Sequence, residues 1–369
     1  MLHLSQQKQK LMKLNKFRTF ALITFITVII YYFQHIHSAE FVFEDSQWIG
    51  FTGSWNPKSL MMNIPNNFLA IWSFYIFPHE APVEHSVNLL IHIVNALILA
   101  SLINQWDGPG WIVGSLFLIN PLSIQAVAYA AGRSELLGLT ELLGLLWFAT
   151  VNDLSVFYRW IGFLLYAIAM LFTKATLIVF TPFLLIWIYL SDYDLYWLKK
   201  LDLELFAIYL ISILFMAPRV IAHISSDIPL WHWFLAQTSA SWMLLYSALI
   251  GRNLSIDHAW WMIDFRLQLI SAVALIIAII MILISRYPFI SFGLGWWFIT
   301  ISPRLLIPSK LGWIREHHAY VPLVGICIAL ASLIQELSCL HVAEGNLESQ
   351  SRDLECSGSS SFLLEMEND

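Results

Sequence analysis

Apolar segments long enough to cross a lipid bilayer recur along most of this chain. A membrane-spanning helix needs about 17–25 mostly apolar residues. Eleven segments approach or reach that length: 19–33, 86–103, 111–131, 136–151, 156–172, 175–190, 203–222, 231–250, 267–285, 289–307 and 319–335. Hydrophobic residues make up 59% of the chain and charged residues 12%, against about 45–50% and 25% in soluble domains. The sequence therefore predicts an all-α polytopic membrane protein with about 11 transmembrane helices.

The charged residues divide the chain into three parts. Residues 1–18 form a basic N-terminus, which we expect in the cytoplasm, and residues 19–340 form the membrane domain. Residues 341–369 hold seven acids and one base, a net charge of −6, and their Ser, Glu and Gly content predicts disorder. The other 340 residues carry 18 acids and 18 bases, so no basic patch indicates a nucleic-acid partner. The three scattered cysteines give no metal-ligand spacing.

The distribution of lysine and arginine predicts the orientation. With the N-terminus inside and eleven spans, twelve bases fall on the inner side, among them Arg266 and Arg315. Only four fall on the outer side, including Arg133 and Lys174. This asymmetry favours a cytoplasmic N-terminus. It also makes each outer cation a candidate for a special role, such as binding an anionic lipid phosphate.

A long first outer loop, residues 37–84, is rich in aromatic residues and proline. Its stretch Asn66–Phe77 is apolar but too short to cross a bilayer, so we expect an interfacial helix or a re-entrant segment. Glu44 and Asp45 also lie in this loop, between aromatic residues. They are either solvated loop acids or a general base, because apolar surroundings raise a carboxyl pKa and allow it to take a proton from a hydroxyl group.

Polar residues also occur inside and beside the spans. His85, Asn88, His92 and Asn95 follow one helical stripe, which either forms interhelical hydrogen bonds or lines a polar site. The cations Arg133, Lys174 and Arg219 either bind an anionic lipid or form structural ion pairs, for example Arg133 with Glu135. His317 and His318 are adjacent, and neighbouring side chains on a helix diverge. We therefore predict no metal site, although a divalent cation stays possible as a cofactor.

Several of these motifs, taken in order, resemble one protein family. The spacing of His85, Asn88, His92 and Asn95 is similar to an H-x-x-N-x-x-x-H-x-x-N helix in the transmembrane-and-TPR O-mannosyltransferase-like proteins and their bacterial relatives. Residues 118–137, with their Ala-Gly-Arg-Ser-Glu sequence, look like the next signature of that family, and residues 316–322 resemble its late E-H/R-R-x-Y-L-P element. The matches run in order from about residue 18 to residue 337.

This resemblance implies a GT-C glycosyltransferase fold that transfers a sugar from a polyprenyl-phosphate donor to a hydroxyl acceptor outside the cytoplasm. Asp45 and Glu44 then correspond to the catalytic acidic pair. His92, Asn88, Arg133, Glu135, Lys174 and Arg219 become candidates for substrate binding. The bacterial relatives imply the inner membrane, with the site facing the periplasm. The acceptor, whether protein or glycan, stays open.

The chain also departs from the family pattern. Glu44 replaces the first Asp of the acidic pair, Asn120 replaces the His of an H-P element, and Ala175 replaces the Glu of a Ser-Lys-Glu element. The C-terminal TPR array is absent from this sequence. Two other classes of function therefore stay open beside the enzyme: a catalytically degenerate membrane scaffold of the same fold, and a transporter of lipids or small molecules.

Overall fold

The computed structural model consists of helices wherever it describes the chain. The described residues are 19–30 except 21, 40, 68–74, 76, 80–150, 154–174, 177, 228–252, 264–306 except 286, and 315–346. Among them every regular element is a helix and none is a strand. The α-helices are α4 (Phe68–Phe74), α5 (Ala81–Gln105), α6 (Gly110–Ile119), α7 (Ile124–Ala128), α8 (Arg133–Thr150), α9 (Val156–Thr173), α12 (Leu230–Ile250), α13 (Phe265–Ile284), α14 (Pro288–Leu306) and α15 (Tyr320–Asn346). The all-α membrane class is confirmed at this level.

Four helices in the described part of the chain are long and apolar enough to cross a membrane: α5, α13, α14 and the helix formed by residues 316–338. A fifth span is possible if α6 and the short helices that follow it, bent by 56°, count as one. The predicted spans 175–190, apart from Leu177, and 203–222 lie outside the described residues, as do Glu44, Asp45 and most of the first loop. The count of eleven transmembrane helices therefore stays a prediction.

The bend between α6 and α7 has a local cause. Pro121 has no N–H to continue the helix, and the Asn120 side chain caps the 3₁₀ turn that follows (η3, Pro121–Ser123) by accepting a hydrogen bond from the Leu122 N–H at 3.0 Å. The Asn120 amide also donates to the Ala248 carbonyl at 2.9 Å and so joins this bend to α12. Asn120, which replaces the His of the motif that the chain resembles, therefore has a structural role.

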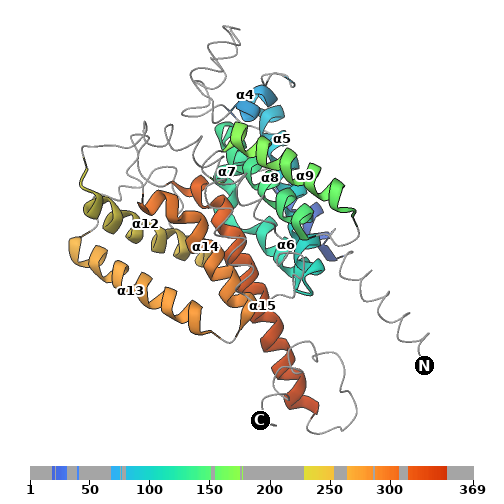
Figure 1. Cartoon of the computed structure of the whole chain (residues 1–369). Coiled ribbons are helices and arrows are strands. Elements are labelled where there is room, and N and C mark those ends of the chain that lie inside the picture. The colour runs from blue at the N-terminus through green and yellow to red at the C-terminus, as the bar shows by residue number, and fades with distance from the viewer. Residues whose placement is uncertain are drawn as a thin grey trace.

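The core of the bundle forms around α5, α8, α14 and α15. Gly293 of α14 and Gly325 of α15 let these two helices approach so closely that a Cβ built on either residue meets the other's carbonyl oxygen at 2.3 or 2.2 Å. Small residues commonly allow membrane helices to pack in this way. By contrast, α13 exposes most of its apolar side chains, and Figure 1 shows it at the periphery of the bundle. This face is suited to contact with lipid.

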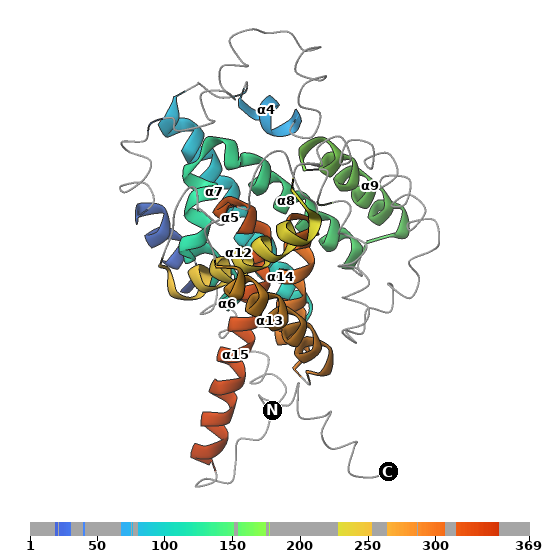
Figure 2. The same cartoon turned by 90° about the vertical axis from the view of Figure 1, so that its left-hand side faces the viewer.

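Figures 1 and 2 both place α4 at the end of the bundle opposite the C-terminal half of α15. We call this end the α4 end. The α4 helix has seven residues, which agrees with the prediction that the Asn66–Phe77 segment is too short to cross. The last long helix ends at Asn346, so it includes the first six residues of the tail that was predicted to be disordered.

The predicted alternation of spans is wrong for α12 and α13. The rings of Trp231 and Phe265 lie 6.4 Å apart, and Trp242 donates a hydrogen bond to the Ser271 carbonyl. Thus α12 and α13 run parallel, whereas the sequence prediction made the spans 231–250 and 267–285 antiparallel. Hydropathy identified both helices correctly, but it does not report how residues 251–264 connect them.

Candidate functional site

The structure describes five of the predicted substrate-binding residues: Asn88, His92, Arg133, Glu135 and Lys174. Glu44, Asp45 and Arg219 lie outside the described residues. The five described residues fall into two groups. Asn88, His92 and Arg133 belong to a buried polar network, whereas Glu135 and Lys174 form an ion pair with each other.

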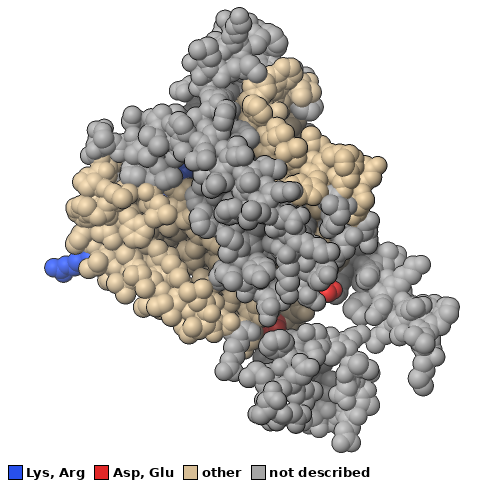
Figure 3. Space-filling model, viewed as in Figure 1, with Lys and Arg blue, Asp and Glu red and all other residues tan. Residues whose placement is uncertain are grey.

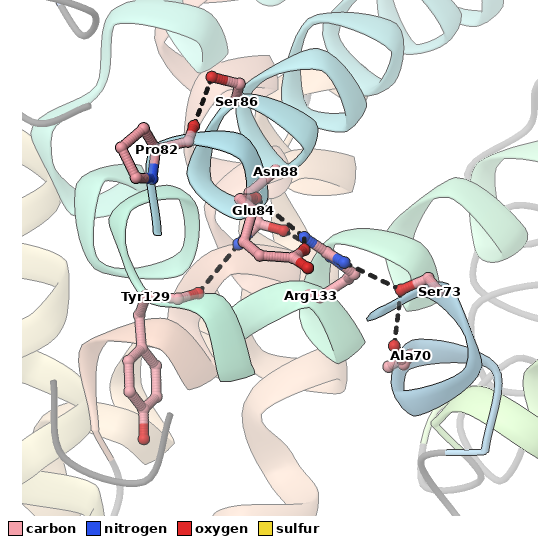
Figure 4. Close-up of polar contacts among 8 residues, drawn as sticks. All are labelled: Ala70, Ser73, Pro82, Glu84, Ser86, Asn88, Tyr129 and Arg133. Carbon is pink, nitrogen blue, oxygen red and sulfur yellow. Dashed lines mark hydrogen bonds and ion pairs between the residues drawn. The ribbon is translucent and has the colours of Figure 1, made fainter. Parts of the chain in front are cut away.

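Arg133 lies at the centre of the buried network (Figure 4). Its Nη2 donates to the Glu84 carboxylate at 2.6 Å and to the Glu84 carbonyl at 2.8 Å. Its Nε donates to Asn88 Oδ1 at 2.8 Å, and its Nη1 donates to the Ser73 hydroxyl at 3.1 Å. The side chains of Arg133 and Glu84 are both 0% exposed. The guanidinium also lies 4.2 Å from the centre of the Phe74 ring.

These contacts support the structural alternative for Arg133, with Glu84 rather than Glu135 as its partner. Each guanidinium nitrogen already donates to a protein acceptor, and none of the side chain is accessible to a ligand. A buried cation is tolerated in this way only if it is paired and hydrogen-bonded. Arg133 therefore holds α4, α5 and α8 together, and its predicted contact with a lipid phosphate has no support in this geometry.

His92 and Asn95 form a second part of the buried network. His92 Nδ1 lies 2.8 Å from the Tyr320 hydroxyl, and its Nε2 lies 3.3 Å from the Leu118 carbonyl. Because a carbonyl only accepts, Nε2 carries the hydrogen and Nδ1 accepts from Tyr320. The Asn95 amide donates to the Leu136 carbonyl at 2.9 Å and to the Tyr320 hydroxyl at 3.3 Å. The stripe thus forms interhelical hydrogen bonds, as one of the two sequence interpretations predicted.

A second charged group, which we call the cation cluster, lies at the α4 end. It consists of Lys174, Arg304, Arg315, His317 and His318, around the carboxylate of Glu135. Lys174 pairs with Glu135, while Arg304 Nη2 lies 2.7 Å from His318 Nε2. The positive charges of Lys174, Arg304 and Arg315 all act on the rings of His317 and His318. The cluster therefore joins α8, α9, α14 and the 3₁₀ turn before α15 (η7, Glu316–Ala319).

Two hydrogen-bond donors meet at one imidazole ring in the cation cluster. The backbone N–H of Arg315 donates to His318 Nδ1 at 2.9 Å. In a neutral imidazole the other nitrogen, Nε2, then carries a hydrogen, yet it faces a second donor, Arg304 Nη2. A neutral ring satisfies only one of these two donors. This arrangement favours an anionic ligand, because an anion would supply a further acceptor beside the ring and is attracted by the surrounding positive charges.

The cluster is also partly accessible to a ligand. Lys174, Arg304, Arg315, His317 and His318 are all half-buried, unlike the fully buried Arg133. Burial, and to a smaller extent the nearby Arg304 guanidinium, lower the pKa of the Lys174 ammonium well below its usual range. A bound anion would favour the charged form of Lys174. On the face drawn in Figure 3, the described residues show few charged side chains.

A metal ion is a less suitable occupant of this site. The potential ligand atoms of Glu135, His317 and His318 all lie within 4.8 Å of one another. The two imidazole rings are 4.1 Å apart, so the prediction that adjacent histidines diverge is wrong in this 3₁₀ turn. However, Lys174 already pairs with Glu135, and Arg304 faces His318. A cation would be repelled by these charges, whereas an anion would be attracted.

Sequence reasoning missed Arg304 and placed Arg315 on the wrong side relative to Lys174. The predicted topology put Lys174 outside and Arg315 inside, about 30 Å apart across a bilayer. In the structure both belong to one cluster, joined through Glu135 and His318. One signal was present in the sequence. Arg304 is a cation inside an apolar span, and such residues commonly mark functional sites.

Comparison of the chain with protein-family models, curated proteins and solved structures finds no match. The family resemblance consequently depends on the sequence motifs alone. Of these motifs, the structure brings the Ala-Gly-Arg-Ser-Glu segment and the Glu-His-His segment together, since Glu135 lies beside His317 and His318.

Proposed function

We propose that this protein is a membrane glycosyltransferase that moves a sugar from a polyprenyl-phosphate-linked donor to a hydroxyl acceptor on the extracytoplasmic side. The observation that carries the proposal is the convergence of the positive charges of Lys174, Arg304 and Arg315 at the α4 end, where two donors also meet at the His318 ring. A lipid phosphate supplies both negative charge and acceptor oxygens. Its prenyl chain would occupy the surrounding lipid, to which these apolar helices are adapted.

In this proposal the cation cluster binds the donor phosphate. Arg304 and Arg315 provide planar guanidinium groups that bind phosphate oxygens in pairs, and Lys174 provides a point charge. Glu135 holds Lys174 in place before the donor arrives. The roles of catalytic base for Asp45, of orienting the acceptor for Glu44, and of donor binding for Arg219 follow from the family resemblance.

Asn88, His92 and Arg133 support the site from within the bundle in this proposal. Their hydrogen bonds join α5 to α8 and α15. Glu135 lies in α8, and α15 directly follows η7. Substitution of these residues would therefore alter the site indirectly. This differs from the direct substrate contacts that the sequence motifs predicted.

A binding measurement tests the phosphate site. Purified protein in nanodiscs is titrated with farnesyl phosphate, and with farnesol as the uncharged control. Lys174→Ala and Arg304→Ala should each weaken farnesyl phosphate binding by about 10–150-fold, the equivalent of the 1.5–3 kcal/mol typical of a hydrogen bond to a charged group. The matched control is Arg266→Ala, because Arg266 is an exposed cation at the N-terminal end of α13. Parental affinity in both cluster variants would contradict the phosphate site.

A transfer assay tests the reaction itself. Membranes containing the protein receive a radiolabelled polyprenyl-phosphate sugar, and labelled products other than the donor are measured. Replacement of Asp45 by Asn should slow transfer by about 10²–10⁴-fold, the contribution of general-base catalysis, without weakening donor binding. Glu44→Gln should have a smaller effect. Donor binding with no transfer by the parent protein would exclude the enzyme and favour the scaffold or the transporter, which a vesicle uptake assay then separates.

A further inference from the structure

A third acid of α8, Glu141, lies in the middle of this helix. It follows Arg133 by eight residues, roughly 12 Å along the helix axis, and belongs to the predicted span 136–151. Glu141 is 7% exposed. An ionisable side chain inside a membrane domain costs free energy and commonly marks a functional site. Neither the buried polar network nor the cation cluster includes Glu141.

The carboxyl group of Glu141 has a single hydrogen-bond partner in the described part of the chain. The hydroxyl of Thr173, the last residue of α9, donates to Oε1 at 2.6 Å, and Thr173 is itself fully buried. The other oxygen, Oε2, is buried and has no hydrogen-bond partner among the described residues. A buried carboxylate needs a counter-charge or several donors, whereas a neutral carboxylic acid needs neither.

The cation next to Thr173 in the chain, Lys174, is directed to a different carboxylate. Its side chain crosses α8 at Gly138, where a Cβ built on the glycine meets Lys174 Cβ at 3.2 Å and Cδ at 3.7 Å. Gly138 lies three residues after Glu135 and three before Glu141, so Lys174 crosses α8 between the two acids. The single ammonium pairs with Glu135. Glu141 is thus left without this counter-charge.

The remaining cations of α8 and α9 do not neutralise Glu141 either. Arg133 pairs with Glu84, and Arg159 precedes Thr173 by fourteen residues, roughly 21 Å along α9. The α4 helix has no titratable residue. The other titratable side chains that α5, α9 and α15 bring towards α8 do not hydrogen-bond to Glu141 in the described structure, and these are His85, His92, Tyr166 and Tyr320.

We propose that Glu141 is a proton-binding site inside the bundle, and that a hydrophobic carbodiimide modifies its neutral carboxyl group. The bound proton takes the place of the counter-charge that a buried carboxylate would need. It also leaves Glu135 as the carboxylate partner of Lys174 in the cation cluster. In the modification, the carboxyl proton moves to a carbodiimide nitrogen while a carboxyl oxygen bonds to the central carbon, which gives a one-to-one adduct without a leaving group. None of these steps depends on sugar transfer.

Infrared spectroscopy tests the proton directly. The difference spectrum between the parent and Glu141→Gln, both in nanodiscs at pH 7, should contain the C=O stretching band of a protonated carboxylic acid. Glu80→Gln is the control for a solvated acid, because Glu80 is exposed just before α5. Its difference spectrum should contain carboxylate bands. Carboxylate bands in place of the carboxylic-acid band for Glu141→Gln would overturn the proposal.

Protein stability gives an independent measure. Glutamine has the shape of a neutral glutamic acid, so Glu141→Gln should leave the midpoint of chemical denaturation unchanged. Glu84→Gln is the matched comparison, because Glu84 is also buried but pairs with Arg133, and this substitution should lower the midpoint. A decrease in Glu141→Gln as large as that in Glu84→Gln would show a paired carboxylate at position 141 and would contradict the proton site.

Chemical labelling tests the modification site. After treatment with dicyclohexylcarbodiimide, peptide mass spectrometry should locate the adduct at Glu141, while the ion-paired Glu84 stays unmodified. The adduct should be lost in Glu141→Gln. Labelling of Glu141 should be unchanged in Lys174→Met, because Lys174 pairs with Glu135. An unmodified Glu141 in the parent, or labelling that appears only in Lys174→Met, would overturn the assignment.

Discussion

Two charged groups lie close together in this bundle, and they differ in hydrogen bonding and in burial. Around Arg133, the carboxylate and carbonyl of Glu84, the amide oxygen of Asn88 and the hydroxyl of Ser73 accept the hydrogen bonds of a fully buried cation. Around His318, by contrast, donors from Arg304 and Arg315 converge on one ring, and the groups are half-buried. The first group is complete without a ligand. The second group is half-buried, and an anion would supply a second acceptor where the two donors meet at His318.

The difference shows why a cation in a membrane protein is a poor predictor of function by itself. Arg133 and Lys174 have the same charge and the same predicted side of the membrane. Among the described residues, what separates them is burial and hydrogen bonding: Arg133 is fully buried and bonded through all three guanidinium nitrogens, whereas Lys174 is half-buried. Neither property is visible in the sequence. The following predictions test this contrast, from the largest expected effect to the smallest.

Glu84→Gln should destabilise the protein most. It leaves the buried charge of Arg133 without its counter-charge, and breaking a buried ion pair in this way typically costs about 3–5 kcal/mol. The unfolding free energy in detergent, from chemical denaturation, measures the effect. Glu80→Gln serves as the control, because Glu80 is exposed just before the same helix. An unchanged stability in Glu84→Gln would mean that the Arg133 group is not a structural ion pair.

Arg304→Met should reduce the stabilisation by ligand, whereas it should not reduce the stability of the free protein. Without ligand the variant should be at least as stable as the parent, because the substitution removes a positive charge that lies beside other positive charges. Farnesyl phosphate at about 100 times its Kd should stabilise the parent by about 2.7 kcal/mol and the variant much less. Thermal unfolding with and without the lipid measures both effects. A loss of stability in the unliganded variant would make the cation cluster structural, like the Arg133 group.

The affinity of the cation cluster for anions should depend on pH. Burial and Arg304 lower the pKa of Lys174 in the free protein, and a bound anion stabilises the charged ammonium. Affinity should therefore be highest below this lowered pKa and fall as the pH rises through it, by at most about tenfold per pH unit. Titrations with farnesyl phosphate across this range measure the slope. In Lys174→Arg, which stays charged, the decrease should disappear; a decrease that persists would assign it to another group.

Tyr320→Phe should have the smallest effect. The hydroxyl joins His92 and Asn95, so its removal costs about 1 kcal/mol, the typical net value of a hydrogen bond. Denaturant unfolding compares it with Tyr287→Phe, a substitution of an exposed tyrosine. Because the Tyr320 hydroxyl belongs to the buried polar network and not to the cation cluster, farnesyl phosphate binding should change less than in Arg304→Met. A larger loss of binding than of stability would move His92 and Tyr320 into the ligand site.

The sequence predicted where the helices lie in the chain better than it predicted which helices pack against one another. The apolar runs identify α5, α13 and α14, and the proline and asparagine at positions 120–121 explain the bend after α6. The polar stripe on α5 also followed from helical spacing. The sequence-based topology failed between Lys174 and Arg315, because it assumed that every long apolar run crosses once and that each connection returns to the adjacent position. The parallel contact of Trp231 with Phe265 contradicts that assumption.

The sequence by itself therefore determined that the chain is apolar enough for a lipid bilayer and that it folds into helices. Backbone groups within lipid must be satisfied internally, and continuous apolar runs of this length satisfy them as helices, so hydropathy selects the helical class. The tertiary structure decided which cations are structural and which are accessible. Glu84, 49 residues before Arg133, neutralises it, while Arg304 and Arg315 join Lys174 from more than a hundred residues away. Pairings of this kind depend on helix packing over long separations in the chain, and local sequence patterns carry no information about them.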